Sequence, residues 1–118
     1  EFTSEIVADK AALDESVERA AVMARTDKNS VVTFDIREDG MNITALTAIG
    51  RVDESLKVSL EGKDVKIALN CKYVSDCLGA VSDEKVRIGF NGAVAPCVVT
   101  PVEGDSYLYL ILPVRTTA

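Results

Sequence analysis

The chain has 118 residues, of which 47% are apolar and 27% charged, and its formal net charge is -6. This length and composition are typical of one globular domain and unlike those of a disordered chain. The sequence has no histidine, so it cannot build Ser-His-Asp or Cys-His catalysis or a histidine-ligated metal site. Its 19 acidic and 13 basic residues argue against a strong electrostatic grip on nucleic acid.

The three cysteines, Cys71, Cys77 and Cys97, are widely and irregularly spaced. This pattern is neither a disulfide framework nor a metal-binding motif. We therefore expect three small buried residues in a reducing compartment, with no metal and no cofactor. No stretch approaches the roughly 18 apolar residues that a membrane span needs. Together these features favour a cytoplasmic protein.

The first half of the chain begins with a short apolar pair, Ile6 and Val7, which predicts a strand. Apolar residues then recur at helical spacing, which predicts a helix over residues 10–26 with Asp9 as its N-cap. Alternating apolar residues predict three strands after the helix, at residues 32–36, 42–49 and 52–60.

The second half repeats this order. Residues 65–69 alternate as a strand, Asn70 is a second candidate N-cap, and apolar residues up to Val81 follow helical spacing. Three further strands are predicted, at residues 85–90, 94–100 and 107–112. The two N-caps lie 61 positions apart, and the halves are about 1–62 and 63–118.

A repeated strand-helix-three-strand order indicates two similar halves whose strands complete shared sheets. We therefore predict an α+β fold made of two βαβββ units. Both helices should lie on one side of mainly antiparallel sheets, and residues 1–118 should form a single domain.

Two apolar segments do not fit an isolated globule. Val22 and Met23 lie off the apolar stripe of the first helix, so they indicate either a wide buried face or a protein contact. Residues 110–112 are apolar at consecutive positions and suit a central strand buried on both sides. That interpretation leaves Pro113 and Val114 unexplained, whereas an apolar surface patch would account for them.

The tail, residues 106–115, resembles the C-terminus of the bacterial replicative sliding clamp family, the beta subunit of DNA polymerase III. Further segments resemble the third domain of that family in the same order: residues 20–25, 64–74, 84–88 and 95–102. No single motif is specific, but the ordered set covers essentially the whole chain. The resemblance implies a DNA-clamp fold with three such domains per subunit, of which this chain would be the last.

The resemblance also implies a non-catalytic processivity factor of DNA replication. In the family, two subunits close head to tail into a homodimeric ring around duplex DNA, without sequence specificity. The ring tethers DNA polymerase III through its alpha subunit, and it binds the clamp loader and other proteins that carry a clamp-binding motif. Basic residues on the helices would face the DNA, and the candidates are Lys10, Arg19, Arg25, Lys28 and Lys72. Solvated surface cations are the alternative interpretation of each one.

Partners of the family insert short peptides with Leu and Phe anchors into a hydrophobic pocket. The residues of this chain that match the pocket are Val94, Pro96, Leu110, Ile111, Leu112, Pro113, Val114 and Arg115. The ring interface of the family corresponds to Val22 and Met23, with Asp53 and Glu54 on a following strand. Residues 49–51 depart from the family, which often has acids there.

Two other functions follow from different features. A scaffold domain could share this fold without a role in replication. A small enzyme could use a pair of carboxylates drawn from Asp35, Asp39, Asp53 and Asp64, provided that two of them converge in a deep cleft with separated pKa values.

Overall fold

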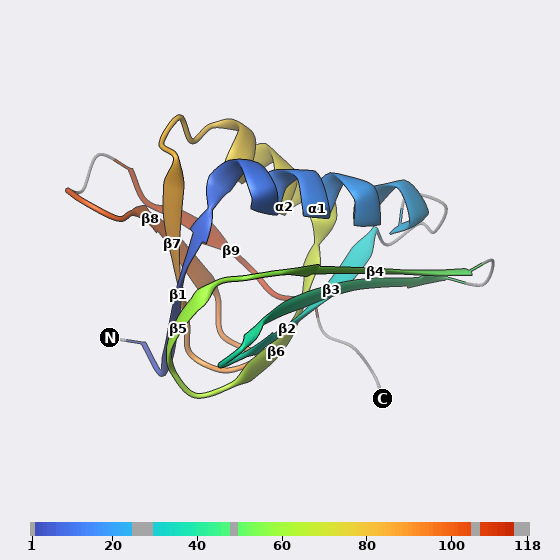
Figure 1. Ribbon diagram of the computed structural model, residues 1–118, viewed down its shortest axis with the longest axis horizontal. Coiled ribbons are helices and arrows are strands. Elements are labelled where there is room, and N and C mark those ends of the chain that lie inside the picture. Colours follow the sequence, from blue (N-terminus) through green and yellow to red (C-terminus); the bar gives the residue numbers. More distant parts are fainter. Residues whose placement is uncertain (1, 25–29, 48–49, 105–106, 115–118) are drawn as a thin grey trace.

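Two antiparallel sheets and two helices make up the domain, and the computed structural model describes residues 2–24, 30–47, 50–104 and 107–114. Figure 1 shows both helices on the same side of the sheets, as predicted. The elements in chain order are β1 (Ser4–Asp9), α1 (Lys10–Ala24), β2 (Val31–Arg37), β3 (Gly40–Thr47), β4 (Gly50–Leu56), β5 (Ser59–Gly62), β6 (Val65–Asn70), α2 (Cys71–Gly79), β7 (Lys85–Phe90), β8 (Cys97–Pro101) and β9 (Tyr109–Ile111).

The two halves of the chain exchange their first strands. β1 lies in the five-stranded sheet β5-β1-β7-β8-β9, beside the last three strands of the second half. β6 lies in the four-stranded sheet β4-β3-β2-β6, beside the strands of the first half. All the pairings are antiparallel. The predicted α+β class and the shared sheets are therefore confirmed.

Both predicted N-caps hold the start of a helix. The Asp9 carboxylate accepts a hydrogen bond from the Ala12 N–H at 3.1 Å, and the Asn70 side chain accepts one from the Lys72 N–H at 2.9 Å. Each bond satisfies a backbone donor that has no partner within its helix. α1 ends its described part at Ala24, so the end of the predicted helix, residues 25–26, lies outside the described residues.

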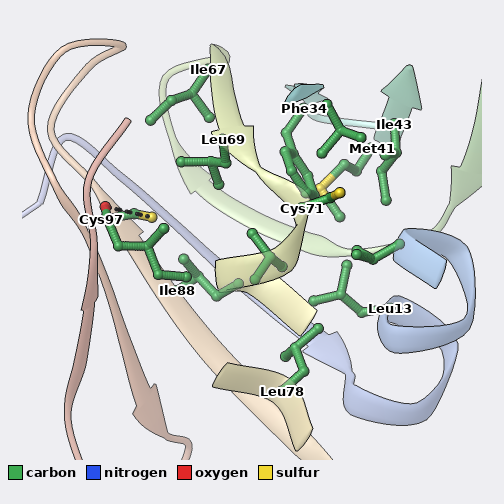
Figure 2. Close-up of a cluster of buried hydrophobic side chains, with 14 of the residues drawn as sticks. Leu13, Phe34, Met41, Ile43, Ile67, Leu69, Cys71, Leu78, Ile88 and Cys97 are labelled. Atoms are coloured by element: carbon green, nitrogen blue, oxygen red, sulfur yellow. Dashed lines mark hydrogen bonds between the residues drawn. The ribbon is translucent and has the colours of Figure 1, made fainter. Parts of the chain in front are cut away.

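The core lies between the two sheets and under the helices (Figure 2). It joins Leu13 of α1, Phe34 of β2, Ile67 of β6 and Ile88 of β7, so it draws on both halves of the chain. The three cysteines are buried, as predicted. The Cys97 thiol donates a hydrogen bond to the Ile111 carbonyl at 3.5 Å, the dashed line in Figure 2.

The prediction of one strand over residues 52–60 is wrong. The chain forms two strands there, and β4 pairs with β3 whereas β5 pairs with β1 in the other sheet. Leu56, Val58 and Leu60 nevertheless all pack against the core. Because the two sheets share that core, the apolar alternation continues from β4 into β5. The alternation therefore does not reveal where the chain passes from one sheet to the other.

Several strand ends also differ from the prediction. The strand predicted at residues 94–100 begins only at Cys97, and the last strand is limited to Tyr109–Ile111. β3 begins at Gly40, and the predicted end of that strand, residues 48–49, lies outside the described residues. β9 is an edge strand with Leu110 exposed, so a central strand buried on both sides is wrong for the tail.

Gly62 ends β5 at the crossing between the halves. It pairs with Ser4, and the next residue donates its N–H to the Thr3 carbonyl at 3.1 Å. Gly62 has a φ of +102°, and a Cβ at this position would lie 2.1 Å from the Thr3 carbonyl oxygen. Only glycine combines this backbone conformation with so close an approach.

We expect Gly62→Ala to lower the free energy of unfolding by about 2 kcal/mol or more, because it adds both backbone strain and a clash with Thr3. Urea unfolding followed by circular dichroism measures this loss. The control is Gly79→Ala, since a Cβ at Gly79 meets nothing within 4 Å. Equal losses for the two variants would contradict the proposed role of Gly62.

Burial protects the Cys97 thiol. Desolvation raises its pKa to about 12, against an ordinary value of 9.0. We therefore expect alkylation of Cys97 by iodoacetamide at pH 8 to be at least about tenfold slower in the folded protein than in urea, as measured by peptide mass spectrometry. Stability should fall as the pH rises above 9, because the unfolded chain then loses the proton and the folded chain does not. Equal alkylation rates in the folded protein and in urea would show that the Cys97 thiol is accessible to solvent.

Candidate partner-binding surfaces

The tail connects the two sheets after the last strand. β9 ends at Ile111, and Pro113 has no N–H to donate. The Val114 N–H then bonds to the Ala68 carbonyl of β6 at 2.8 Å. Because β6 is the edge strand of the other sheet, the tail covers the junction between the sheets.

An apolar hollow lies beside this connection. Its volume is about 840 Å³, and we call it the tail groove. Its lining residues are Thr33, Lys66, Ile67, Ala68, Ala93, Val94, Leu112, Pro113 and Val114. Val94 and Leu112 are 82% and 69% exposed, so two large apolar side chains in the same hollow are open to solvent. The groove is therefore suited to bind apolar side chains of a partner.

The predicted pocket residues fall into separate groups. Val94, Leu112, Pro113 and Val114 come together in the tail groove. Leu110 and Ile111 instead line a second hollow of about 340 Å³, which Tyr73 and Ala80 line from the side of α2.

Two further pocket candidates do not line either hollow in the described structure. Pro96 is exposed in the loop before β8, outside the residues that line the tail groove. Arg115 lies outside the described residues.

Sequence reasoning missed the contribution of β6 and β2 to the tail groove, which is Lys66, Ala68 and Thr33. One signal was present in the sequence. Ala68 is small, apolar and buried at a position of β6 where the alternation with Lys66 and Asn70 calls for an outward side chain. A small apolar residue there indicates that another segment covers the strand.

The end of α1 lies against β4, which is the edge strand of the four-stranded sheet opposite β6. Val22 is 68% exposed, whereas Met23 is partly buried against the core and its sulfur accepts a hydrogen bond from the Thr47 hydroxyl at 3.3 Å. Leu46 of β3 is also exposed. Val22 is therefore available for a protein contact, and Met23 mainly supports the sheet.

Asp53 and Glu54 are neighbours on β4, so their side chains point to opposite faces of the sheet. Glu54 accepts a hydrogen bond from Arg19 of α1 at 2.8 Å. Asp53 is bound by Arg51 at 2.9 Å and by the Thr44 hydroxyl at 2.8 Å, and these bonds lower the pKa of Asp53. The two acids therefore do not form one cluster on a single face.

The basic residues predicted to face DNA occupy different places. Lys10 and Arg19 belong to α1, and Lys72 is exposed in the first turn of α2. Arg19 is paired with Glu54, and Glu15 lies 3.9 Å away. Arg25 and Lys28 lie outside the described residues.

The carboxylates considered for catalysis do not form an acid-base pair. Asp35 and Asp39 line the same shallow hollow of about 460 Å³, but Arg37 binds Asp35 at 3.2 Å. Asp64 is exposed. The lowered pKa of Asp53 is opposite to what a general acid needs. Among the described residues, no three His, Cys, Asp or Glu side chains are grouped to hold a metal ion.

This architecture matches solved structures of bacterial sliding clamps. The DNA polymerase sliding clamp from Bacillus subtilis matches 99% of this chain with a TM-score of 0.95 at 28% identity, and the chain covers 32% of that structure. The beta subunit of the DNA polymerase of Streptococcus pyogenes matches 98% with a TM-score of 0.94 at 33% identity, and again 32% of it is covered. The fold is therefore that of one domain of a sliding clamp.

Curated relatives of similar sequence are also sliding clamps. The beta sliding clamp of Halalkalibacterium halodurans is 40% identical over 105 residues, and that of Staphylococcus aureus is 33% identical over 103 residues. Each alignment covers 86% of this chain but only 28% and 27% of the relative. The model of the DNA polymerase III beta subunit, C-terminal domain, matches residues 1–115, so the chain belongs to this family.

The chain thus spans less than a third of the length of these relatives. In the described part of the chain, neither helix is long and apolar enough to span a bilayer.

The hydrogen bond from Val114 to Ala68 can be tested by removing its donor. We expect Val114→Pro to lower the free energy of unfolding by about 1 kcal/mol and to shift the NMR signals of Ala68 and Leu112. Val114→Ala retains the N–H and is the control, so the difference between the two variants in urea unfolding isolates the bond. If both variants unfold alike and the Ala68 carbonyl signal is unchanged in each, the tail is not held by this bond.

Proposed function

We propose that this chain acts as the C-terminal domain of a ring-shaped sliding clamp, a processivity factor of DNA replication. The observation that carries the proposal is the family match over residues 1–115, together with the likeness to solved clamps over almost the whole chain. The chain's length, about a third of those clamps, suits one of three domains in a subunit. The domain boundaries, 1–118 with halves near residue 62, remain part of this proposal.

The charges of the helices suit a ring that encircles DNA without gripping it. Two basic residues of α1 are outnumbered by Asp14, Glu15 and Glu18, and Asp76 offsets the one basic residue of α2. A closed ring stays on duplex DNA by topology, so it can slide while binding phosphates weakly. Lys10 and Lys72 are the proposed DNA-facing cations in the described structure, with Arg19 held mainly by Glu54.

The tail groove is the proposed binding site for partner peptides. Apolar walls with a polar edge suit a short motif with Leu and Phe anchors. The proposed partners are the alpha subunit of DNA polymerase III, the clamp loader and other proteins with such a motif. The preceding domain would supply the rest of the pocket, so this chain alone should bind peptides weakly.

The edge of the four-stranded sheet is the proposed ring interface. β4 has a neighbour on one side only among the described strands, and exposed Val22 and Leu46 lie on the elements packed beside it. An unpaired strand edge with apolar residues nearby is suited to pair with another subunit. Met23 and Glu54 would support this edge from the helix side, and Asp53 from the opposite face.

The domain carries no catalytic role in this proposal. Its relatives are named as clamps, and two of the acids considered for catalysis, Asp35 and Asp53, are paired with arginines. Buried thiols are consistent with the reducing cytoplasm, where a replication protein would act.

The peptide site can be tested by NMR titration of this chain with a peptide of the type Gln-Leu-x-Leu-Phe. We expect concentration-dependent shifts at Leu112 and Val114, and we expect Leu112→Ser to weaken them strongly, because it removes an apolar wall of the groove. Leu46→Ser is the matched control, since Leu46 and Leu112 are 68% and 69% exposed and neither should be needed for folding.

A peptide with its Leu and Phe replaced by Ala should cause no shifts. If the anchored peptide leaves Leu112 and Val114 unchanged at millimolar concentration, also with the preceding domain restored, the tail groove is not the peptide site. Equal effects of the two Leu→Ser variants would also contradict the assignment.

A further inference from the structure

Lys66 stands where two hollows meet. It lines the tail groove, and together with Thr33 it also lines another hollow, of about 360 Å³, on the four-stranded sheet. We call this hollow the polar groove, because Asp35, Asn42, Thr44 and Arg51 contribute to its walls. A ligand whose apolar side chains fill the tail groove would therefore bring its neighbouring residues next to Lys66.

The other charged groups near Lys66 are already paired. Arg37 binds both carboxylate oxygens of Asp35 at 3.2 and 3.5 Å, and Arg51 binds those of Asp53 at 2.9 and 3.2 Å. Asp35 lies directly opposite Lys66 in the pairing of β2 with β6, but its charge is offset by Arg37.

Lys66 differs from these arginines. It is exposed, and within the described ranges it makes no ion pair within 4.0 Å. Asp64, the nearest acid along β6 in sequence, is exposed and precedes the strand. Among the side chains that the structure describes, the mouth of the tail groove thus presents a positive charge with no paired acid.

We propose that Lys66 is a specificity residue that selects partner peptides carrying an acidic side chain beside their apolar anchors. The inference rests on the peptide-binding function proposed above and adds the charge of the flanking residue. An exposed ion pair contributes modestly, so the acid tunes the affinity while the apolar anchors provide most of it.

Three peptides with the same Leu and Phe anchors test this at low salt: one with Asp before the anchors, one with Asp after them, and one with Asn at both places. NMR titration of the Leu112 signal gives each Kd. We expect one Asp peptide to bind about two- to fivefold more tightly than the Asn peptide. Lys66→Gln should abolish this difference, and high salt should reduce it.

Lys85→Gln is the control, because Lys85 is also exposed but lies on β7, outside both grooves. It should leave the preference for Asp unchanged. If neither Asp peptide binds more tightly than the Asn peptide, or if the preference survives in Lys66→Gln, Lys66 does not select for acids. If none of the three peptides shifts Leu112, the peptide site itself is overturned and this inference with it.

Discussion

The exchange of first strands between the two halves holds this domain together. β1 completes the sheet of the second half, and β6 completes that of the first, so neither half has a core of its own. The buried pairs Ile6–Ile88 and Phe34–Ile67 lie across the two exchanged strands. Loosening either strand exposes apolar residues of both sheets at once, which ties the two halves into one cooperative unit.

The same exchange places the proposed peptide site. β6 is the edge of its sheet because it has crossed from the other half, and its outer side is therefore free to receive the tail. The bond between Val114 and Ala68 then creates a groove from segments of both sheets. Leu112 and Val94 remain exposed in this setting, since the core is already filled from the inner side of the strands.

The charged side chains are of two kinds, those paired within the domain and those available to partners. Arg19, Arg37 and Arg51 are each bound to a carboxylate, so they fasten the helix to the sheet or stiffen the sheet surface. Lys66 has no such acid among the residues that the structure describes, and it lines both hollows. An acidic domain can therefore present a local positive charge to a ligand, which its net charge of -6 does not reveal.

The sequence by itself determined most of the element order, both N-caps and the buried cysteines, because these depend on local periodicity and capping. The repeated order of the elements also indicated the shared sheets. It also indicated that Val22, Pro113 and Val114 were unusual. Only the tertiary structure divided residues 52–60 between two sheets and showed β9 to be an edge strand. It also separated Leu110 from Leu112 and added Lys66 and Ala68 to the tail groove. Alternation reports whether a residue faces the core, but the neighbour of each strand depends on contacts between residues far apart in the chain.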